Sequence, residues 1–482
     1  MIGKRLPKLN APDAVTGRTR FTDDLSFPGM LHAKLLRSPH AHARILRIDT
    51  SAALALPGVH AVITGRDLPV MYGILPWTRD EYPLALEYTR YVGDAVACVA
   101  AIDESTAARA LRAIQVDYEV LPHVLDPHAA LAPGAPKVND FAKEGNVTKH
   151  VHLEFGDVDE ELARSDVVET GDYFFEGTTH AAIEPHCAIG LWEPAGVLTV
   201  LSATQVPHYL HRELARVLEL RADRIRVIQP PVGGAFGGKS EPFDLEFCVA
   251  KLAMLTGRPV KLLYTRDEVF YAHRGRHPMK MHVRLGAMKD GRLTACDSRN
   301  LIDGGAYASF GLVTSYYSGQ LVTAPLRLTA YRFDATRVYT NKPACGPKRG
   351  HGSVQPRFAF EVTVDKVAER LGLDPIELRR RNLIEPGERT VNELFIRSTG
   401  FAECLDRVEA ASDWKTRHGK LGFGRGLGVA GSFYISGTNY PIYPNDMPQS
   451  AVQVKVDRSG RITVFAGVSE IGQGTEAMLA MI

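Results

Sequence analysis

Hydrophobic and polar positions in the first part of the chain follow both strand-like and helix-like spacing. Residues 104–114 have helix-forming composition, and the alternating run from Val116 to Val120 is typical of a half-buried strand. The apolar run 197–201 predicts a further strand. Because both patterns recur along the chain, we expect a mixed α/β (α+β) fold.

Three later helices are predicted from start signals and from one apolar stripe. Residues 358–371 carry apolar side chains on one helical face: Phe360, Val364, Val367 and Leu371. Proline is favoured in the first turn of a helix, so helices are expected to begin near Pro207 and at Asp374-Pro375, with Asp374 as the N-cap. Gln205 then lies on the loop that enters the Pro207 helix.

Two hairpins resemble each other. Strand 281–285 turns at Asp290-Gly291, and strand 452–456 turns at Ser459-Gly460 into strand 462–465. An internal duplication of a β-rich unit would explain the likeness, and independent origin would explain it equally well. The chain stops inside an apolar, helix-like run at Ile482, which leads us to expect a chain cut short.

The order of these patterns suggests three domains. Residues 131–136 are rich in proline and glycine, as expected of a boundary between domains. We therefore predict an N-terminal α/β domain over residues 1–130, a second α+β domain over residues 131–395, and an incomplete third domain over residues 396–482.

Composition excludes several classes of protein. The chain has 482 residues, with 57 Lys and Arg against 55 Asp and Glu, so its charge gives no support for a nucleic-acid partner. No apolar run is long enough to span a membrane, and the N-terminus lacks the apolar core of a signal peptide. The 6 cysteines are scattered without a C-x-x-C pair, which argues against zinc or an iron–sulfur cluster in this chain and favours the cytoplasm.

A glycine-rich run, Gly233 to Ser240, is the strongest chemical signal. It fits the P-loop pattern G-x-x-x-x-G-K-[ST] and precedes a predicted helix over residues 241–255, so nucleotide binding is one interpretation. Pro230 and Pro231 argue against a central strand leading into a phosphate loop. Closely spaced glycines also let the backbone approach another anionic or metal-oxo ligand, and a structural turn is the third alternative.

Several motifs together resemble one family. Thr204-Gln205, the glycine run, Arg349-Gly350-His351-Gly352 and Gly472-Gln473-Gly474 follow the order found in the molybdenum-binding large subunits of the xanthine oxidase (molybdenum hydroxylase) family. The runs Arg37 to Ala41 and Glu184 to Cys187 match further landmarks, so the resemblance covers nearly the whole chain. It implies a hammerhead-like N-terminal domain followed by molybdopterin-binding domains, and it outweighs the P-loop interpretation.

The resemblance also implies roles for individual residues. The residues expected to bind the cofactor are Gln205, Gly234, Phe236, Gly237, Arg349, Gly472, Gln473 and Gly474. Gln205 would donate its amide to a metal-oxo group, and Phe236 and Gly237 would present their backbone to it. Arg349 would steady negative charge on the substrate as a catalytic residue. For Phe236 alone, packing in the core is an equal alternative, and no side chain is expected to ligate a metal.

Departures from the family pattern narrow the expected substrate. Ser240 stands where purine-oxidising members of the family have a glutamate, which puts xanthine in doubt as the substrate. Carbon monoxide dehydrogenases of the family hold copper with a cysteine in the loop of Arg349. No cysteine follows Arg349 here, so a copper site is improbable. Tyr316 and Tyr317, with the run Gly431 to Gly437, look closest to the α subunit of 4-hydroxybenzoyl-CoA reductase. Tyr317 would then protonate a ring radical anion, whereas the alternative is that the two tyrosines form a half-buried strand pair.

The resemblance finally implies cofactors and partners. The cofactor is expected to be molybdenum–molybdopterin in its cytosine dinucleotide form, with [2Fe–2S] clusters and FAD on separate iron–sulfur and flavin subunits in a dimer of heterotrimers. The expected reaction is reductive dehydroxylation of an aromatic CoA thioester. Hydroxylation of an aldehyde or an N-heteroaromatic compound is the alternative, and an inert fragment that binds no cofactor is a third possibility.

Overall fold

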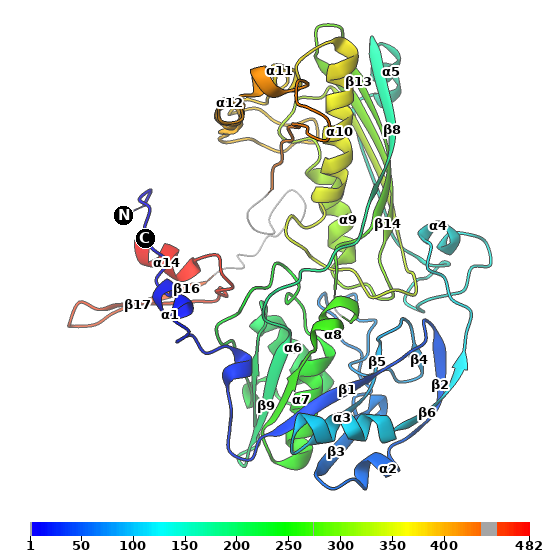
Figure 1. Ribbon diagram of the computed structural model, residues 1–482, viewed down its shortest axis with the longest axis vertical. Helices are drawn as coiled ribbons and strands as arrows, with labels where there is room; N and C mark the ends of the chain where they lie inside the picture. The colour runs from blue at the N-terminus through cyan, green and yellow to red at the C-terminus, as the bar shows by residue number, and fades with distance from the viewer. Residues whose placement is uncertain (1, 273, 435–450) are drawn as a thin grey trace.

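The structure is a computed structural model that describes residues 2–272, 274–434 and 451–482. Figure 1 shows two large units, each built on a β-sheet, with a smaller region beside them that holds both ends of the chain. Helices and strands are interleaved along the whole sequence. The predicted mixed α/β fold is therefore confirmed.

A seven-stranded mixed sheet lies in the lower unit of Figure 1. Its strands, in order across the sheet, are β11 (Ile225–Ile228), β10 (Val197–Ser202), β9 (Cys187–Glu193), β12 (Val260–Leu263), β1 (Leu31–Arg37), β5 (Ala95–Ala101) and β3 (Val59–Thr64). β10 confirms the strand predicted at 197–201. β5 is buried along its whole length, which accounts for its continuous apolar sequence. Since β1 pairs in parallel with β12, this sheet joins residues from both sides of the expected boundary at 131–136.

Helix α7 (Asp244–Thr256) packs on β9, β10 and β12 of this sheet. Its hydrophobic side chains Phe247, Val249 and Leu252 are fully buried in the largest core cluster. The helix begins three residues later than the start predicted at 241. The glycine run therefore lies in the loop between β11 and α7.

A three-stranded sheet completes the N-terminal part of the chain. It contains β4 (Tyr88–Thr89), β2 (Ala43–Asp49) and β6 (Gln115–Val120). Helices α2 (Ser51–Leu54) and α3 (Glu104–Ala113) contact each other and pack on the seven-stranded sheet, α2 on β3 and α3 on β1 and β5. The Asp103 carboxylate accepts a hydrogen bond of 2.7 Å from the Thr106 N–H and caps α3. The helix predicted at 104–114 and the strand predicted at 116–120 are thus confirmed.

The upper unit is built on a five-stranded sheet covered by two helices (Figure 1). Its strands, in order, are β7 (Val147–Phe155), β15 (Ala330–Val338), β14 (Leu293–Asp303), β13 (Met279–Ala287) and β8 (Val167–Phe175). Helix α10 (Val354–Leu371) packs on β8 and β13, and α9 (Gly311–Gln320) packs on β7 and β15. Phe360, Val364 and Val367 are buried in the core, as the apolar stripe predicts.

The interpretation of Tyr316 and Tyr317 as a strand pair is wrong, because both residues lie in α9. Their aromatic side chains favour a strand, but a glycine nearby in the same segment, Gly319, allows a helix to pack there instead. A Cβ atom on Gly319 would lie 2.6 Å from the Phe333 ring on β15. The absence of a side chain at Gly319 therefore lets a helix approach the sheet closely at this point.

The remaining elements are short or lie at the edges of the two units. The helices are α1 (Ala11–Val15), α4 (Pro127–Ala130), α5 (Val158–Ala163), α6 (Pro207–Val217), α8 (Arg266–Tyr271), α11 (Pro375–Arg381), α12 (Phe401–Ala411), α13 (Trp414–Arg417) and α14 (Thr475–Met481), with 3-10 turns η1 (Thr22–Asp24), η2 (Gly65–Asp67) and η3 (Ala222–Arg224). The starts predicted for α6 and α11 are confirmed, and Asp374 caps α11 by accepting from the Ile376 N–H at 2.8 Å. Across the described residues, we find no helix that is both long and apolar enough to cross a bilayer.

Both predicted hairpins are present. The first joins β13 to β14, and the second joins β16 (Val452–Val456) to β17 (Ile462–Ala466). Their common origin stays a prediction. The N-terminal segment lies beside α14 in Figure 1, and an ion pair of 3.1 Å between Lys8 Nζ and Glu470 Oε1 joins the two ends of the chain.

Candidate cofactor site

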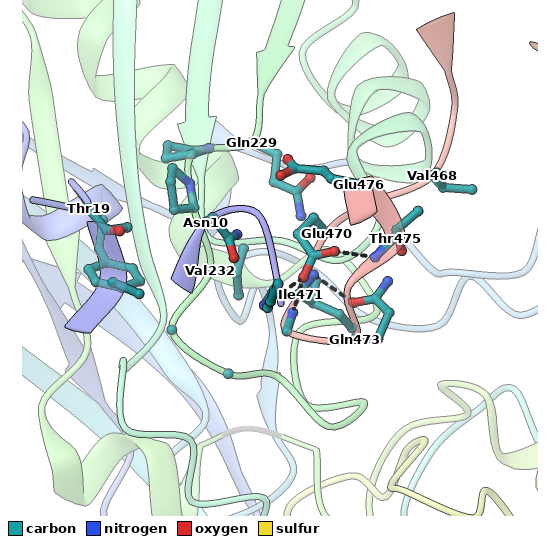
Figure 2. Close-up of a pocket in the computed structure, with 18 of the residues that line it drawn as sticks. Asn10, Thr19, Gln229, Val232, Val468, Glu470, Ile471, Gln473, Thr475 and Glu476 are labelled. Atoms are coloured by element: carbon teal, nitrogen blue, oxygen red, sulfur yellow. Dashed lines mark hydrogen bonds and ion pairs between the residues drawn. The ribbon is translucent and has the colours of Figure 1, made fainter. Parts of the chain in front are cut away.

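A cavity of about 910 Å³ lies where three distant segments of the chain meet (Figure 2). Its walls come from the N-terminal segment, from the loop that contains the glycine run, and from the segment around β17 and α14. The predicted site residues that line it are Gly234, Phe236, Arg349, Gly472 and Gln473. Those outside its lining are Gln205, Gly237, Gly474 and Tyr317. The structure therefore brings together two glycine loops that are far apart in the sequence.

The first loop, residues 233–239, presents free backbone donors. Within the described parts of the chain, the N–H groups of Gly234, Ala235 and Phe236 have no hydrogen-bond acceptor. Gly234 and Phe236 have φ values of 96° and 55°, so the backbone enters the left-handed region twice. Consecutive N–H groups in such a turn form a concave surface that binds anions. The Phe236 side chain is 49% exposed, which excludes the core-packing alternative.

Gly237 allows this loop to touch a third segment. Its φ is 100°, and a Cβ atom there would lie 2.5 Å from the carbonyl oxygen of Pro347. Two residues further along, the Arg349 N–H donates to the Phe236 carbonyl at 3.0 Å. The glycine is therefore required by close contact between two loops rather than by contact with the cavity itself.

Gln205 supports the first loop from behind. Its side-chain Oε1 accepts from the N–H groups of Gly237 at 3.0 Å and Lys239 at 3.3 Å, and its own N–H donates to the Lys239 carbonyl at 2.8 Å. Its amide nitrogen has no acceptor among residues 2–272, 274–434 and 451–482. The side-chain oxygen of Gln205 is used to hold the loop, so its side-chain nitrogen remains available to donate a hydrogen bond to a ligand.

Two further residues that hold this loop were not assigned a role from the sequence. Lys239 Nζ forms a buried ion pair of 2.7 Å with Glu184 Oε2, which also accepts from the Gly233 N–H at 2.8 Å. His186 Nε2 contacts the Gly238 carbonyl at 2.8 Å, and burial lowers the pKa of His186 to about 3. The imidazole is therefore neutral at pH 7 and can donate this hydrogen bond. Glu184 and His186 both belong to the Glu184-Pro185-His186-Cys187 motif, and this motif is the sequence signal that could have identified them.

The second loop, residues 472–475, has three of its backbone donors already occupied. The Glu470 carboxylate accepts from the N–H groups of Gly472 at 2.9 Å, Gly474 at 3.2 Å and Thr475 at 2.6 Å (Figure 2). The Gln473 side chain bonds locally, accepting from the Ile471 N–H at 2.8 Å and donating to the Ser469 carbonyl at 2.7 Å. The two loops thus differ, since one has free N–H groups and the other is closed by its own carboxylate.

Arg349 and Tyr317 lie at different depths. Arg349 is exposed at the cavity, and Arg276 donates to its carbonyl. Tyr317 is buried on α9, with its ring centroid 5.4 Å from that of His351 and 6.4 Å from that of Tyr434. Burial lowers the pKa of His351 to about 3. Residues 435–437 of the run Gly431 to Gly437 lie outside the described residues.

The position of Lys239 counts against the P-loop interpretation. A P-loop lysine reaches toward phosphates, whereas Lys239 is buried against Glu184. β11 ends at Ile228, before the two prolines, and α7 begins at Asp244, five residues after Lys239. The run therefore lacks the direct passage from strand to loop to helix that nucleotide phosphates need.

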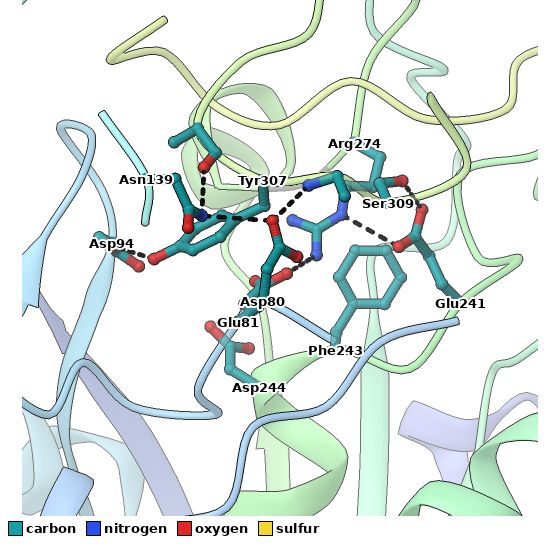
Figure 3. A network of polar contacts seen from close by, with 12 residues as sticks. Asp80, Glu81, Asp94, Asn139, Glu241, Phe243, Asp244, Arg274, Tyr307 and Ser309 are labelled. Carbon is teal, nitrogen blue, oxygen red and sulfur yellow. Dashed lines mark hydrogen bonds and ion pairs between the residues drawn. The ribbon is translucent and has the colours of Figure 1, made fainter. Parts of the chain in front are cut away.

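A separate network of buried carboxylates joins the N-terminal part of the chain to the rest (Figure 3). Arg274 pairs with Glu81 and, at 3.3 Å, with Glu241. Asp80 accepts from the Tyr339 hydroxyl at 2.7 Å, and Asp94 accepts from the Tyr307 hydroxyl at 2.8 Å. Burial, with repulsion from Asp80, Glu241 and Asp94, raises the pKa of Glu81 to about 8 despite the arginine.

This network predicts that stability falls as the pH rises from about 4.5, the ordinary pKa of a glutamate, to about 8, the pKa of Glu81 in the folded chain. A carboxyl whose pKa is raised in the folded state binds its proton more tightly there, so the free energy of unfolding falls until the pH exceeds the folded pKa. For Glu81 the loss reaches at most about 1.4 kcal/mol per pH unit. Urea unfolding between pH 6.5 and 8.5 should show this fall, and Glu81→Gln should flatten it. An equal slope in Glu81→Gln and in the exposed control Glu403→Gln would contradict the prediction.

Comparison with known families agrees with the geometry. Residues 140–383 match the model of the molybdopterin cofactor-binding domain, and residues 405–482 match a second model with the same description. Residues 16–122 match the a/b hammerhead domain of aldehyde oxidase and xanthine dehydrogenase. These matches define the class as molybdopterin-binding proteins. The chain belongs to the aldehyde oxidase and xanthine dehydrogenase family.

Individual relatives show how far the similarity extends. A probable xanthine dehydrogenase subunit of Bacillus subtilis (strain 168) is 34% identical, over 97% of this chain and 62% of the relative. The nicotinate dehydrogenase large molybdopterin subunit of Eubacterium barkeri is 36% identical, over 86% of this chain and 99% of that subunit. The crystal structure of quinoline 2-oxidoreductase from Pseudomonas putida 86 superimposes with a TM-score of 0.93 at 30% identity, over 99% of this chain and 64% of that one. The chain thus spans less than two thirds of the first and third of these proteins.

Proposed function

We propose that this chain binds molybdopterin in the cavity lined by the two glycine loops and serves as the cofactor part of a molybdenum hydroxylase. One observation carries the proposal. In a chain of this family, three consecutive backbone N–H groups at Gly234, Ala235 and Phe236 are free in the loop that lines the cavity. Such donors suit an anionic or oxo-bearing group, and a side chain at Gly234 would crowd the Phe236 ring at 3.2 Å.

The residues of the chain supply binding and orientation. When bound, the molybdenum–molybdopterin group supplies two-electron redox chemistry at a carbon atom of the substrate. Gly234, Ala235 and Phe236 would hold it through their N–H groups, and the Gln205 amide nitrogen is a further donor in the same loop system. The phosphates of a cytosine dinucleotide form would be the anions that such donors recognise.

Arg349 is the residue of this cavity best suited to handle substrate. Its guanidinium is exposed at the cavity, where a fixed cation stabilises negative charge that develops on a ring or carbonyl. Tyr317 is buried behind the Arg349 loop against His351 and does not line the cavity. This position favours a packing role that supports the loop over proton donation to a substrate.

We propose hydroxylation of an N-heteroaromatic compound or an aldehyde as the reaction. The relatives include proteins named for nicotinate, nicotine, quinoline and aldehydes, which supports this reaction better than reductive dehydroxylation of 4-hydroxybenzoyl-CoA. Relatives named for xanthine keep purines among the candidates, although Ser240 stands in place of the glutamate expected for them.

The proposal predicts both cofactor content and turnover. The purified complex should contain about one molybdenum and one pterin per chain, and it should oxidise nicotinate, quinoline or an aromatic aldehyde with an artificial electron acceptor. Separate assays with xanthine, and with 4-hydroxybenzoyl-CoA in the presence of an electron donor, distinguish the other substrates. A complex that lacks pterin would contradict the cofactor assignment, and one that only dehydroxylates the CoA thioester would contradict the proposed reaction.

Partner subunits are expected because the electrons taken from the substrate must leave the cofactor through other redox centres. The six cysteines are free and scattered, five of them buried, so iron–sulfur clusters and flavin would lie on other subunits. We propose an iron–sulfur and a flavin subunit, assembled as a dimer of heterotrimers. Co-purification from the native host, followed by iron, flavin and mass analysis, tests this arrangement.

A further inference from the structure

We propose that Glu470 is a positioning residue: its carboxylate fixes the conformation of the second glycine loop, so that this side of the cavity is ordered before a cofactor binds. The inference rests on the proposed cofactor site and adds a residue to it. The resemblance assigns the Gly472-Gln473-Gly474 backbone to cofactor binding, but the structure shows the N–H groups of Gly472 and Gly474 engaged by a carboxylate of the same chain.

The contacts of Glu470 account for both of its oxygen atoms. Oε1 accepts from Gly472 and Gly474, and Oε2 accepts from Thr475. Lys8 adds an ion pair of 3.1 Å to Oε1. These hydrogen bonds and Lys8 lower the pKa of Glu470 although partial burial opposes them, so the side chain is ionised at pH 7. Hydrogen bonds to a charged acceptor are roughly twice as strong as neutral ones.

The conformation of the loop explains why it needs such an anchor. Gly472 and Gly474 have φ values of 119° and 86°, and no atom lies within 4 Å of a Cβ built on either. Apart from their chain neighbours, no side chain therefore packs where a Cβ atom of either glycine would lie. Glu470 supplies the constraint that packing does not, and Lys8 connects it to the N-terminal wall of the same cavity.

Glu476 provides a matched control. It lines the same cavity, lies on α14 one residue after Thr475, and makes no hydrogen bond or ion pair through its side chain among the described residues. Glu476→Gln removes one negative charge from the cavity without touching the loop donors. Glu470→Gln removes the same charge and also leaves the loop N–H groups with a weaker, neutral acceptor.

Hydrogen exchange of the full chain without cofactor tests the anchor directly. We expect the peptide covering residues 469–479 to exchange at least ten times faster in Glu470→Gln than in the wild-type chain, and Glu476→Gln to match the wild type. Lys8→Met should give a smaller increase in the same peptide. Equal exchange in Glu470→Gln and wild type would overturn the proposal, whatever the chain binds.

Pterin content of the assembled complex is the second readout. We expect Glu470→Gln to retain about a tenth of the wild-type pterin or less, and Glu403→Gln, at an exposed position on α12 outside the cavity, to retain nearly all of it. Pterin content that is unchanged or increased in Glu470→Gln would overturn the proposal, because the carboxylate would then be dispensable or a competitor for the loop. A wild-type complex without pterin would refute the proposed cofactor site, while the exchange experiment would still decide the role of Glu470.

Discussion

Gly237→Ala should strip the complex of most of its cofactor. The added Cβ atom would lie 2.5 Å from the Pro347 carbonyl oxygen, which belongs to the backbone and cannot turn aside, and a φ of 100° is strained for alanine. Strain and overpacking together are expected to cost roughly 3 kcal/mol or more. We expect molybdenum and pterin content to fall by at least about ten-fold, the range found when support around metal sites is lost.

Gly257→Ala is the control for this change. Gly257 also has a positive φ, 62°, but no atom lies within 4 Å of a Cβ built there, at the end of α7. Its cost should be about 1 to 2 kcal/mol from backbone strain alone, with normal cofactor content. Metal and pterin analysis with urea unfolding compares the two variants. Full cofactor content in Gly237→Ala would show that close contact between the two loops is not required.

Lys239→Met should strongly destabilise the chain, because Lys239 is a buried charged residue of the glycine run. Both members of the Lys239–Glu184 pair are almost fully buried, and without the lysine the Glu184 carboxylate keeps only the Gly233 N–H as a hydrogen-bond donor among the described residues. Breaking a buried pair from one side costs about 3–5 kcal/mol. This loss of unfolding free energy should appear as a lower urea concentration at the midpoint of unfolding.

A double-mutant cycle separates the pair from its surroundings. Glu184→Gln with Lys239→Met should cost less than the sum of the two single changes, because the second change removes the charge that the first one strands. Arg407→Met breaks the exposed pair between Arg407 and Glu403 on α12 and should cost less than about 0.5 kcal/mol. If Lys239→Met proved as mild as Arg407→Met, the pair would have no role in holding the loop.

The elements predicted best from the sequence were those with strong local signals. The apolar stripe of α10, the Asp374 cap of α11, the first-turn proline of α6 and both hairpins were visible because spacing and turn residues determine them. Tyr316 and Tyr317 were misread, since the helix there depends on close packing of Gly319 against Phe333, which is a contact between distant residues. Local patterns cannot report such a contact.

From the sequence, the glycines of the candidate site could be selected, but the residues that support its loops could not. Motif order located Gly234, Phe236, Arg349, Gly472 and Gln473, which line one cavity. The sequence marks Glu184 only as part of a motif and gives no signal for Glu470, because a glutamate has the same sequence signature whether it faces solvent or binds backbone N–H groups. Its role depends on the local fold of the following loop and on Lys8, more than 450 positions away.

The separation of the cavity walls along the sequence sets the order of events during synthesis. Residues near Lys8 leave the ribosome before the wall around Glu470, which follows roughly 20 to 90 seconds later at about 5–20 residues per second. The sheets and the first glycine loop can fold in that interval, but the cavity stays open on one side. If the cavity binds the proposed cofactor, we expect insertion to wait until the segment around Glu470 has folded against the segment around Lys8.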